Sequence, residues 1–275
     1  MKRNMTVHLF GGFALAALLL LGGGAATLAD DKPAQPAAAA PEIKDERALK
    51  LLKEMSDTLA KARTVSFKAR SLAPLVAPTG QYVSLFGTAR VSMQRPDRLL
   101  VESRGDLLPN NLYYNGKTLT AIGPAKKFYA QQDASGGTLD TVLENEQPAA
   151  DILAPFVDFL VSDPYARVAK DLSSALFVGQ STLGGVKTDH LAFAAPGVDW
   201  EVWIGAQDKL PRLVLVSYRG DDRQPHFMVE FSDWKLNAPI PPQTFNVTIP
   251  KDAVRLEFKR QGLPQSAPAL PGEKK

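Results

Sequence analysis

The sequence predicts an α+β protein with one antiparallel sheet, and three features support this fold class. An amphipathic helical segment comes first, short strand-like runs follow in quick succession, and strand-like runs resume after a helical middle. This block order is typical of α+β proteins, in which the helices gather on one side or at one end of the sheet. With 275 residues, 45% of them hydrophobic and 22% charged, the chain can bury a substantial core.

The N-terminus has the order of a signal peptide. Lys2 and Arg3 precede an apolar run over residues 9–21, which is followed by glycines and small residues up to Ala29. This run is shorter than the roughly 20 residues that a membrane-spanning helix needs. We therefore expect residues 1–29 to be a signal peptide cleaved near Ala29, with no stable membrane anchor afterwards. An uncleaved anchor is the alternative.

Two further segments are rich in proline and alanine and contain little to bury. Residues 30–41 are predicted to be a flexible linker, and residues 262–275 a disordered tail. Residues 42–261 are predicted to form a single domain, which is a size that one large β domain can occupy.

The first folded element is predicted to be a helix over residues 43–62. Its apolar residues recur at steps of three and four between charged ones, so one face should lie across a hydrophobic surface. Short β-prone runs separated by Pro, Asn and Gly then indicate an antiparallel meander, with a two-residue hairpin at Asn115-Gly116. The predicted strands of this group are residues 64–71, 81–94, 98–104, 112–114, 119–122 and 127–131.

The middle of the chain loses the period of two, and helices are expected there. Asp163-Pro164 fits an N-cap and first-turn proline. The predicted helices are residues 138–144, 149–161 and 165–176, and the second is apolar over most of its surface. The sheet is then expected to resume with strands at residues 176–181, 187–193, 200–204, 213–218, 226–234 and 245–249, and a charged hairpin tip at residues 219–223.

Several functional classes lose their support. The absence of cysteine excludes disulfides, thiolate metal sites, a cysteine nucleophile and an acylated lipoprotein cysteine. Basic residues are interleaved with acidic ones, which argues against a nucleic-acid partner. No phosphate-binding or dinucleotide-binding glycine motif is present, and His190 and His226 fit ordinary strand residues. We expect no cofactor, no metal and no enzymatic activity. An esterase using Ser181 and His190 is a minor alternative.

Arg95 stands out because it continues the apolar face of a predicted strand. Such a guanidinium needs acceptors or an exit to water, and the backbone carbonyls at a helix C-terminus would suit it. The alternatives are that Arg95 snorkels at the strand end or that a bulge turns it outward. The apolar residues that precede it on this face are Val83, Leu85, Ala89, Val91 and Met93.

The segment around Arg95 resembles a known family. Residues 87–98 (GTARVSMQRPDR), followed by residues 114–119 (YNGKTL), are similar to the glycine-started strand, Arg-Pro-Asn/Asp ending and Asn-Gly-Lys hairpin of LolA-like and LppX-like periplasmic lipoprotein carriers. Residues 244–254 (TFNVTIPKDAV) resemble the closing Phe-x-Phe-x-x-Pro element of that family. The longer segment at residues 132–183 places the chain closer to an uncharacterised periplasmic branch of the superfamily.

The resemblance implies a periplasmic protein with a strongly curved, incomplete antiparallel barrel whose mouth is covered by helices. It makes Arg95 the latch of a lid that includes residues 149–161. The candidate cavity-lining residues are Val83, Leu85, Val91 and Met93 on the strand, with Phe156, Val157 and Leu160 on the lid. The alternative is that these residues are the core of a closed sheet.

Two functions fit this sequence. The first is an exported carrier of a hydrophobic or amphiphilic ligand, such as a lipid or lipoprotein acyl chains. The second is a periplasmic sensor or scaffold module that binds an envelope protein partner, as regulators of envelope stress with this type of domain do. The lack of a second recognisable domain favours the carrier.

Overall fold

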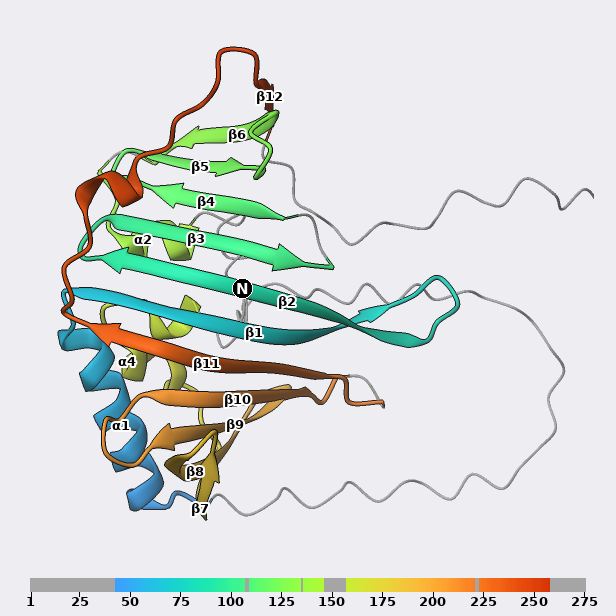
Figure 1. Cartoon of the computed structure of the whole chain (residues 1–275). Helices are drawn as coiled ribbons and strands as arrows, with labels where there is room; N and C mark the ends of the chain where they lie inside the picture. The colour runs from blue at the N-terminus through green and yellow to red at the C-terminus, as the bar shows by residue number, and fades with distance from the viewer. Residues whose placement is uncertain (1–42, 107–108, 135, 146–156, 221–222, 258–275) are drawn as a thin grey trace, which may run out of the picture.

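The fold is an open, strongly curved sheet with its helices on one face. The computed structural model describes residues 43–106, 109–134, 136–145, 157–220 and 223–257. One sheet of 12 strands runs in the order β12-β6-β5-β4-β3-β2-β1-β11-β10-β9-β8-β7 (Figure 1). The sheet does not close, because β12 and β7 lie at opposite edges. The predicted α+β half-barrel with an N-terminal helix is confirmed.

The elements follow the predicted order along the chain. The helical elements are α1 (Glu46–Lys61), α2 (Leu139–Asn145), the 3-10 turn η1 (Val157–Phe159), α4 (Pro164–Val168) and the 3-10 turn η2 (Pro242–Phe245). The strands are β1 (Thr64–Val76), β2 (Tyr82–Gln94), β3 (Arg98–Gly105), β4 (Asn110–Tyr114), β5 (Thr118–Ile122), β6 (Phe128–Asp133), β7 (Ser174–Leu183), β8 (Val186–Ala195), β9 (Val198–Gly205), β10 (Pro211–Tyr218), β11 (His226–Leu236) and β12 (Val254–Leu256).

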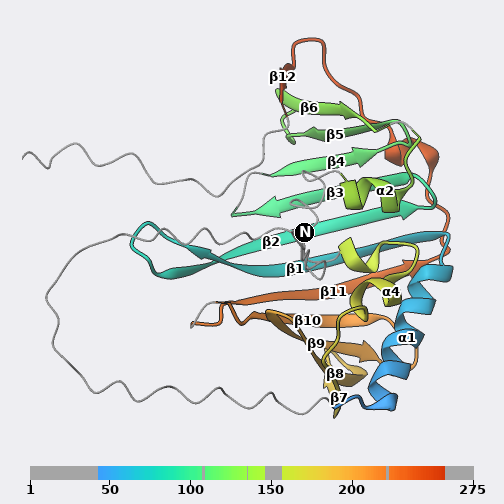
Figure 2. The ribbon, with the colours of Figure 1, turned by 180° about the vertical axis from the view of Figure 1, so that it is seen from behind.

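Helix α1 begins and packs as its sequence predicts. The Asp45 side chain caps it by accepting a hydrogen bond from the Arg47 backbone N–H at 2.8 Å. Its apolar face, including Leu52, Met55 and Leu59, is buried in the main hydrophobic cluster. Figure 2 shows α1, α2 and α4 on the same face of the sheet, which we call the inner face.

The long hairpin β1–β2 is the centre of the sheet. The two strands pair from Thr64 opposite Gln94 to Val76 opposite Tyr82. On its other edge β1 pairs with β11, which joins the strands that precede the helical middle to those that follow it. All neighbouring strands are antiparallel except β6 and β12, which are parallel.

Two sequence predictions are wrong at the level of single elements. The helix predicted over residues 165–176 ends at Val168, and β7 already begins at Ser174, because the Ala175 backbone bonds to Ile43 and Asp45 as part of the sheet edge. The strand predicted over residues 245–249 does not form. The turn η2 buries Phe245 instead, and the short strand β12 follows.

The predicted lid helix over residues 149–161 is described only from residue 157 on. There it is a 3-10 turn followed by an irregular segment, so this end is not α-helical. The predicted signal peptide, linker and C-terminal tail lie outside the described residues and stay predictions. Among the described residues, none of the helices combines the length and the apolar composition of a membrane-spanning segment.

Candidate functional site: a strap over the inner face and its anchors

Arg95 joins two helical elements through backbone carbonyls. It directly follows β2, and its backbone N–H donates to the Arg63 carbonyl at 2.9 Å. Its Nε donates to the Ala62 carbonyl at 3.3 Å, and its Nη2 donates to the Val161 carbonyl at 2.9 Å. Ala62 is the C-cap of α1, and Val161 lies just beyond η1. One part-buried guanidinium therefore ties the end of α1 to residues 157–162, which we call the strap.

The guanidinium of Arg95 is partly desolvated. Burial lowers the pKa of Arg95, and the carboxylate of Asp140 opposes this shift. Asp140 lies on α2 and also accepts a 2.8 Å hydrogen bond from the backbone N–H of Ser162, as well as one from its hydroxyl. Arg95 and Asp140 thus hold adjacent residues of the strap from two different elements.

A buried ion pair anchors the other end of the strap. Asp158, within η1, pairs with Arg167 on α4, and the Asp158 side chain is fully buried. Burial raises the pKa of Asp158 to about 6, although the nearby Arg167 charge and its hydrogen bond act in the opposite direction. Oδ2 of Asp158 has no hydrogen-bond partner. Burial therefore destabilises the charged form of Asp158, and the ion pair with Arg167 offsets part of this destabilisation.

The strap covers the inner face through aromatic contacts. The ring of Phe159 lies 6.1 Å from that of Phe231 on β11, and Phe231 lies 5.6 Å from Phe67 on β1, both in edge-to-face geometry. Leu160 is 1% exposed and belongs to the same hydrophobic cluster as these residues. The strap is thus packed down on the centre of the half-barrel.

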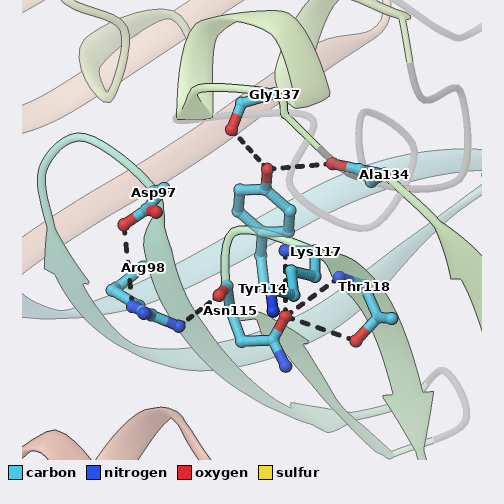
Figure 3. A network of polar contacts seen from close by, with 8 residues as sticks. All are labelled: Asp97, Arg98, Tyr114, Asn115, Lys117, Thr118, Ala134 and Gly137. Carbon is cyan, nitrogen blue, oxygen red and sulfur yellow. Dashed lines mark hydrogen bonds and ion pairs between the residues drawn. The ribbon is translucent and has the colours of Figure 1, made fainter.

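The residues after Arg95 position helix α2. The Pro96 carbonyl accepts a 2.8 Å hydrogen bond from the backbone N–H of Leu139, the first residue of α2. The hydroxyl of Tyr114, a buried residue on β4, donates to the Gly137 carbonyl at 2.5 Å and lies 3.2 Å from the Ala134 carbonyl (Figure 3). These contacts fix the chain just before α2.

The Asn-Gly hairpin packs against the Arg-Pro-Asp turn (Figure 3). Arg98 donates to the Asn115 carbonyl, and Oδ1 of Asn115 accepts from the backbone N–H groups of Lys117 and Thr118 at 3.0 and 2.9 Å. Gly116 has φ +84°, and a Cβ there would collide with Oδ2 of Asp97. The two sequence motifs are therefore parts of one network that holds α2.

The structure separates the predicted lining residues into two groups. Val91 and Met93 are 1% and 0% exposed and belong, with Leu160, to the main hydrophobic cluster. Val83 and Leu85 continue the same face of β2 but are only half-buried. Phe156 lies outside the described residues, and so does the side chain of Val157.

Sequence reasoning singled out Arg95 but missed Tyr114, Asp140 and Asp158. Tyr114 carries a weak signal, since it adds a hydroxyl to an apolar strand next to a hairpin. Asp140 stands among polar residues, where nothing in the spacing marks it, whereas Asp158 is the one charged residue in the apolar run 152–161. A lone carboxylate in such a run is a signal of a buried charge that needs a partner. Their role follows from the packing of α2 and η1.

The minor esterase alternative gains nothing from the geometry. Nε2 of His190 lies 2.7 Å from Oε2 of Glu201, and the ring stacks on Trp203. Oγ of Ser181 lies 3.0 Å from Oγ1 of Thr188. Each residue of the suggested pair thus has another partner. Among the described residues no group of three or more His, Cys, Asp or Glu side chains could hold a metal ion.

Comparisons with known proteins place the chain in a family. A family model described as "Predicted periplasmic protein (DUF2092)" matches residues 48–259. This match confirms the predicted periplasmic location and the assignment to an uncharacterised periplasmic branch. A search of curated proteins finds no match.

Solved structures with a similar fold have low sequence identity to this chain. An uncharacterised conserved protein of Thermus thermophilus is 11% identical, with a TM-score of 0.43 over 77% of this chain and 98% of that one. The lipoprotein LppX of Mycobacterium tuberculosis is 9% identical, with a TM-score of 0.40 over 72% and 99%. A chain of the Pseudomonas aeruginosa MucA/MucB complex is 13% identical, with a TM-score of 0.40 over 74% and 61%.

Proposed function

The chain belongs to this family of predicted periplasmic proteins, and we propose that it is a carrier that holds the acyl chains of an amphiphile on the inner face of the half-barrel, beneath the strap. The observation that carries the proposal is the position of Arg95. Its two side-chain hydrogen bonds connect the end of α1 to the strap, so this side chain contributes to holding the strap on the inner face.

The inner face supplies the apolar surface that an acyl chain needs. On β2 it runs from Met93 and Val91, which are buried, to Leu85 and Val83, which are half-buried. An acyl chain would take the place of Phe159 and Leu160 in the hydrophobic cluster that includes the first pair, and would extend along the second. The exchange of one apolar contact for another makes a movable strap energetically feasible.

The free energy gained by burying methylene groups indicates which kind of ligand could bind. Burial of one methylene contributes about 0.8 kcal/mol, so about a dozen contribute roughly 10 kcal/mol, against an association cost of about 4 to 15 kcal/mol. One short acyl chain would therefore bind marginally. We propose a lipid or lipoprotein with two or three chains as the ligand.

The strap is held by few polar contacts, which favours movement as a unit. They come from Arg95 and Asp140 at one end and from the Asp158–Arg167 pair at the other. Release of the Arg95 contact leaves the Val161 carbonyl free to turn toward water or toward a ligand headgroup.

Solvent extraction of the protein purified from its own envelope, followed by mass spectrometry, tests the proposal. Stoichiometric lipid is the expected result. A lipid-free extract together with a co-purifying envelope protein would refute the carrier and favour the sensor or scaffold function instead.

A variant pair tests the latch itself. Arg95→Leu is expected to tighten ligand retention or to uncouple ligand release, because the Val161 carbonyl of the strap loses its Arg95 donor. Arg90→Leu is the matched control, since Arg90 lies on the same strand but is exposed. Equal loading and release rates in Arg95→Leu and the parent would contradict the role of Arg95.

A further inference from the structure

The tip of the β1–β2 hairpin is an uncharged arm. Residues 71–89 contain no Asp, Glu, Lys or Arg, although Arg70 and Arg90 stand directly on either side. Strand β1 pairs with β11 only as far as Leu72, and β2 pairs with β3 only from Gly87 on. Beyond these positions the two strands pair with each other and project from the sheet (Figure 1). We call residues 72–86 the arm.

Both faces of the arm are apolar. Leu72, Val76 and Phe86 lie on the outer face and are 37%, 36% and 45% exposed. The inner face carries Ala73 and Leu75, paired with Leu85 and Val83, and all four are half-buried. An isolated two-stranded ribbon is marginally stable in water, and exposed apolar side chains on its outer face, with partly exposed ones on the inner face, mark an interaction site.

Polar groups mark where the arm begins and what lies beside its tip. At its base on the outer face, Lys68 pairs with Asp233 at 2.6 Å and Arg70 pairs with Glu230. At its tip the Arg223 guanidinium lies 4.3 Å from the ring centre of Tyr82 and donates to the Gly80 carbonyl at 2.6 Å. The arm is therefore an apolar element with a charged boundary at its base and an aromatic and cationic group near its tip.

We infer that this arm docks on the surface of a lipid bilayer. A protein partner would cover one face of a ribbon, whereas the acyl-headgroup boundary surrounds both faces. The absence of charge over the whole arm lets it enter that boundary, and Tyr82 and Arg223 supply the amphipathic ring and the cation that suit headgroup depth.

The dimensions of the arm agree with shallow insertion. Four to five residues of each strand project beyond the neighbouring strands, which is about 15 Å at the rise of a β-strand. Because Tyr82 and Arg223 lie at the tip, the arm would lie along the acyl-headgroup boundary with both groups at headgroup depth, and it would not enter the hydrocarbon core tip first. The charged pairs at the base would stay among the headgroups. The arm points away from α1, so docking leaves the helical end of the half-barrel free (Figures 1 and 2). The inference does not depend on a bound ligand.

Flotation with vesicles of equal parts phosphatidylethanolamine and phosphatidylglycerol tests this inference on the exported chain. We expect the chain to float with the vesicles, and Phe86→Ser to lower its partition coefficient about tenfold, since about half of this ring remains to be buried. Phe128→Ser is the matched control. Phe128 is 54% exposed on β6, outside the arm, and its replacement should leave the partition coefficient unchanged.

A fluorescent label gives a second measurement that leaves the apolar residues intact. The chain has no cysteine, so an environment-sensitive dye on Ser84→Cys reports only from the arm, and the same dye on Ser232→Cys reports from exposed β11. A blue shift on addition of vesicles is expected at residue 84 and not at residue 232. Absence of flotation, equal losses in Phe86→Ser and Phe128→Ser, or no shift at residue 84 would each overturn the inference.

Discussion

The buried Asp158 carboxyl should make the stability of the protein depend on pH near neutrality. Its pKa is raised from 3.8 to about 6 in the folded protein, chiefly by desolvation. A raised pKa means that the folded state binds this proton more tightly than the unfolded state does. The contribution is therefore fully present below pH 3.8 and is lost as the pH rises through about 6.

The magnitude follows from the size of the shift. A change of one pKa unit corresponds to about 1.4 kcal/mol, so a rise from 3.8 to about 6 corresponds to about 3 kcal/mol between the two protonation states. Asp158→Asn keeps a neutral polar side chain of similar shape but cannot titrate. It leaves Arg167 without its carboxylate at every pH, which adds a constant loss of stability and no slope.

Urea unfolding of the parent and of Asp158→Asn over a range of pH isolates this contribution. The free energy of unfolding of the variant, minus that of the parent, should rise by roughly 2 to 3 kcal/mol between about pH 4 and about pH 7. Other carboxyls titrate equally in both proteins and cancel in the difference. A difference that is flat over this range would show that Asp158 is not buried as described, and the account of the strap anchor would fail.

Three further predictions concern the anchors of the strap and of α2. Arg95→Leu should lower the free energy of unfolding by about 1 to 3 kcal/mol, measured by urea unfolding, because two carbonyls lose their donor; an unchanged value would contradict the latch geometry. In a thermal melt, Gly116→Ala should lower the stability of the protein by about 1 kcal/mol or more beyond the loss caused by Gly80→Ala. Both glycines have a positive φ near 80°, but only the methyl group at residue 116 meets Asp97. Equal losses of stability would argue against the packed turn. Tyr114→Phe should lower the free energy of unfolding by about 1 kcal/mol and speed amide hydrogen exchange in α2. Unchanged exchange there would show that the hydroxyl does not anchor this helix.

Local patterns in the sequence determined most of the fold. The period of two along β2, the three-to-four spacing of α1 and the Asn115-Gly116 turn each describe a structure that neighbouring residues decide. They were sufficient to predict the helix and most strands. The local pattern also indicates that Arg95 needs acceptors or an exit to water, because a guanidinium at the end of an apolar face must satisfy its donors somewhere. Its contact with backbone carbonyls is what the resemblance to the carrier family implies.

The partners of these elements were decided only by the tertiary structure. Periodicity says which face of a strand is buried but not which strand lies beside it, so the pairing of β1 with β11 and of β12 with β6 is absent from any local pattern. The segment after Val168 became part of β7 because Ile43 and Asp45 offer it hydrogen bonds from far along the chain. Asp158 acquires its raised pKa from burial beside Arg167, and burial is a property of the packed molecule.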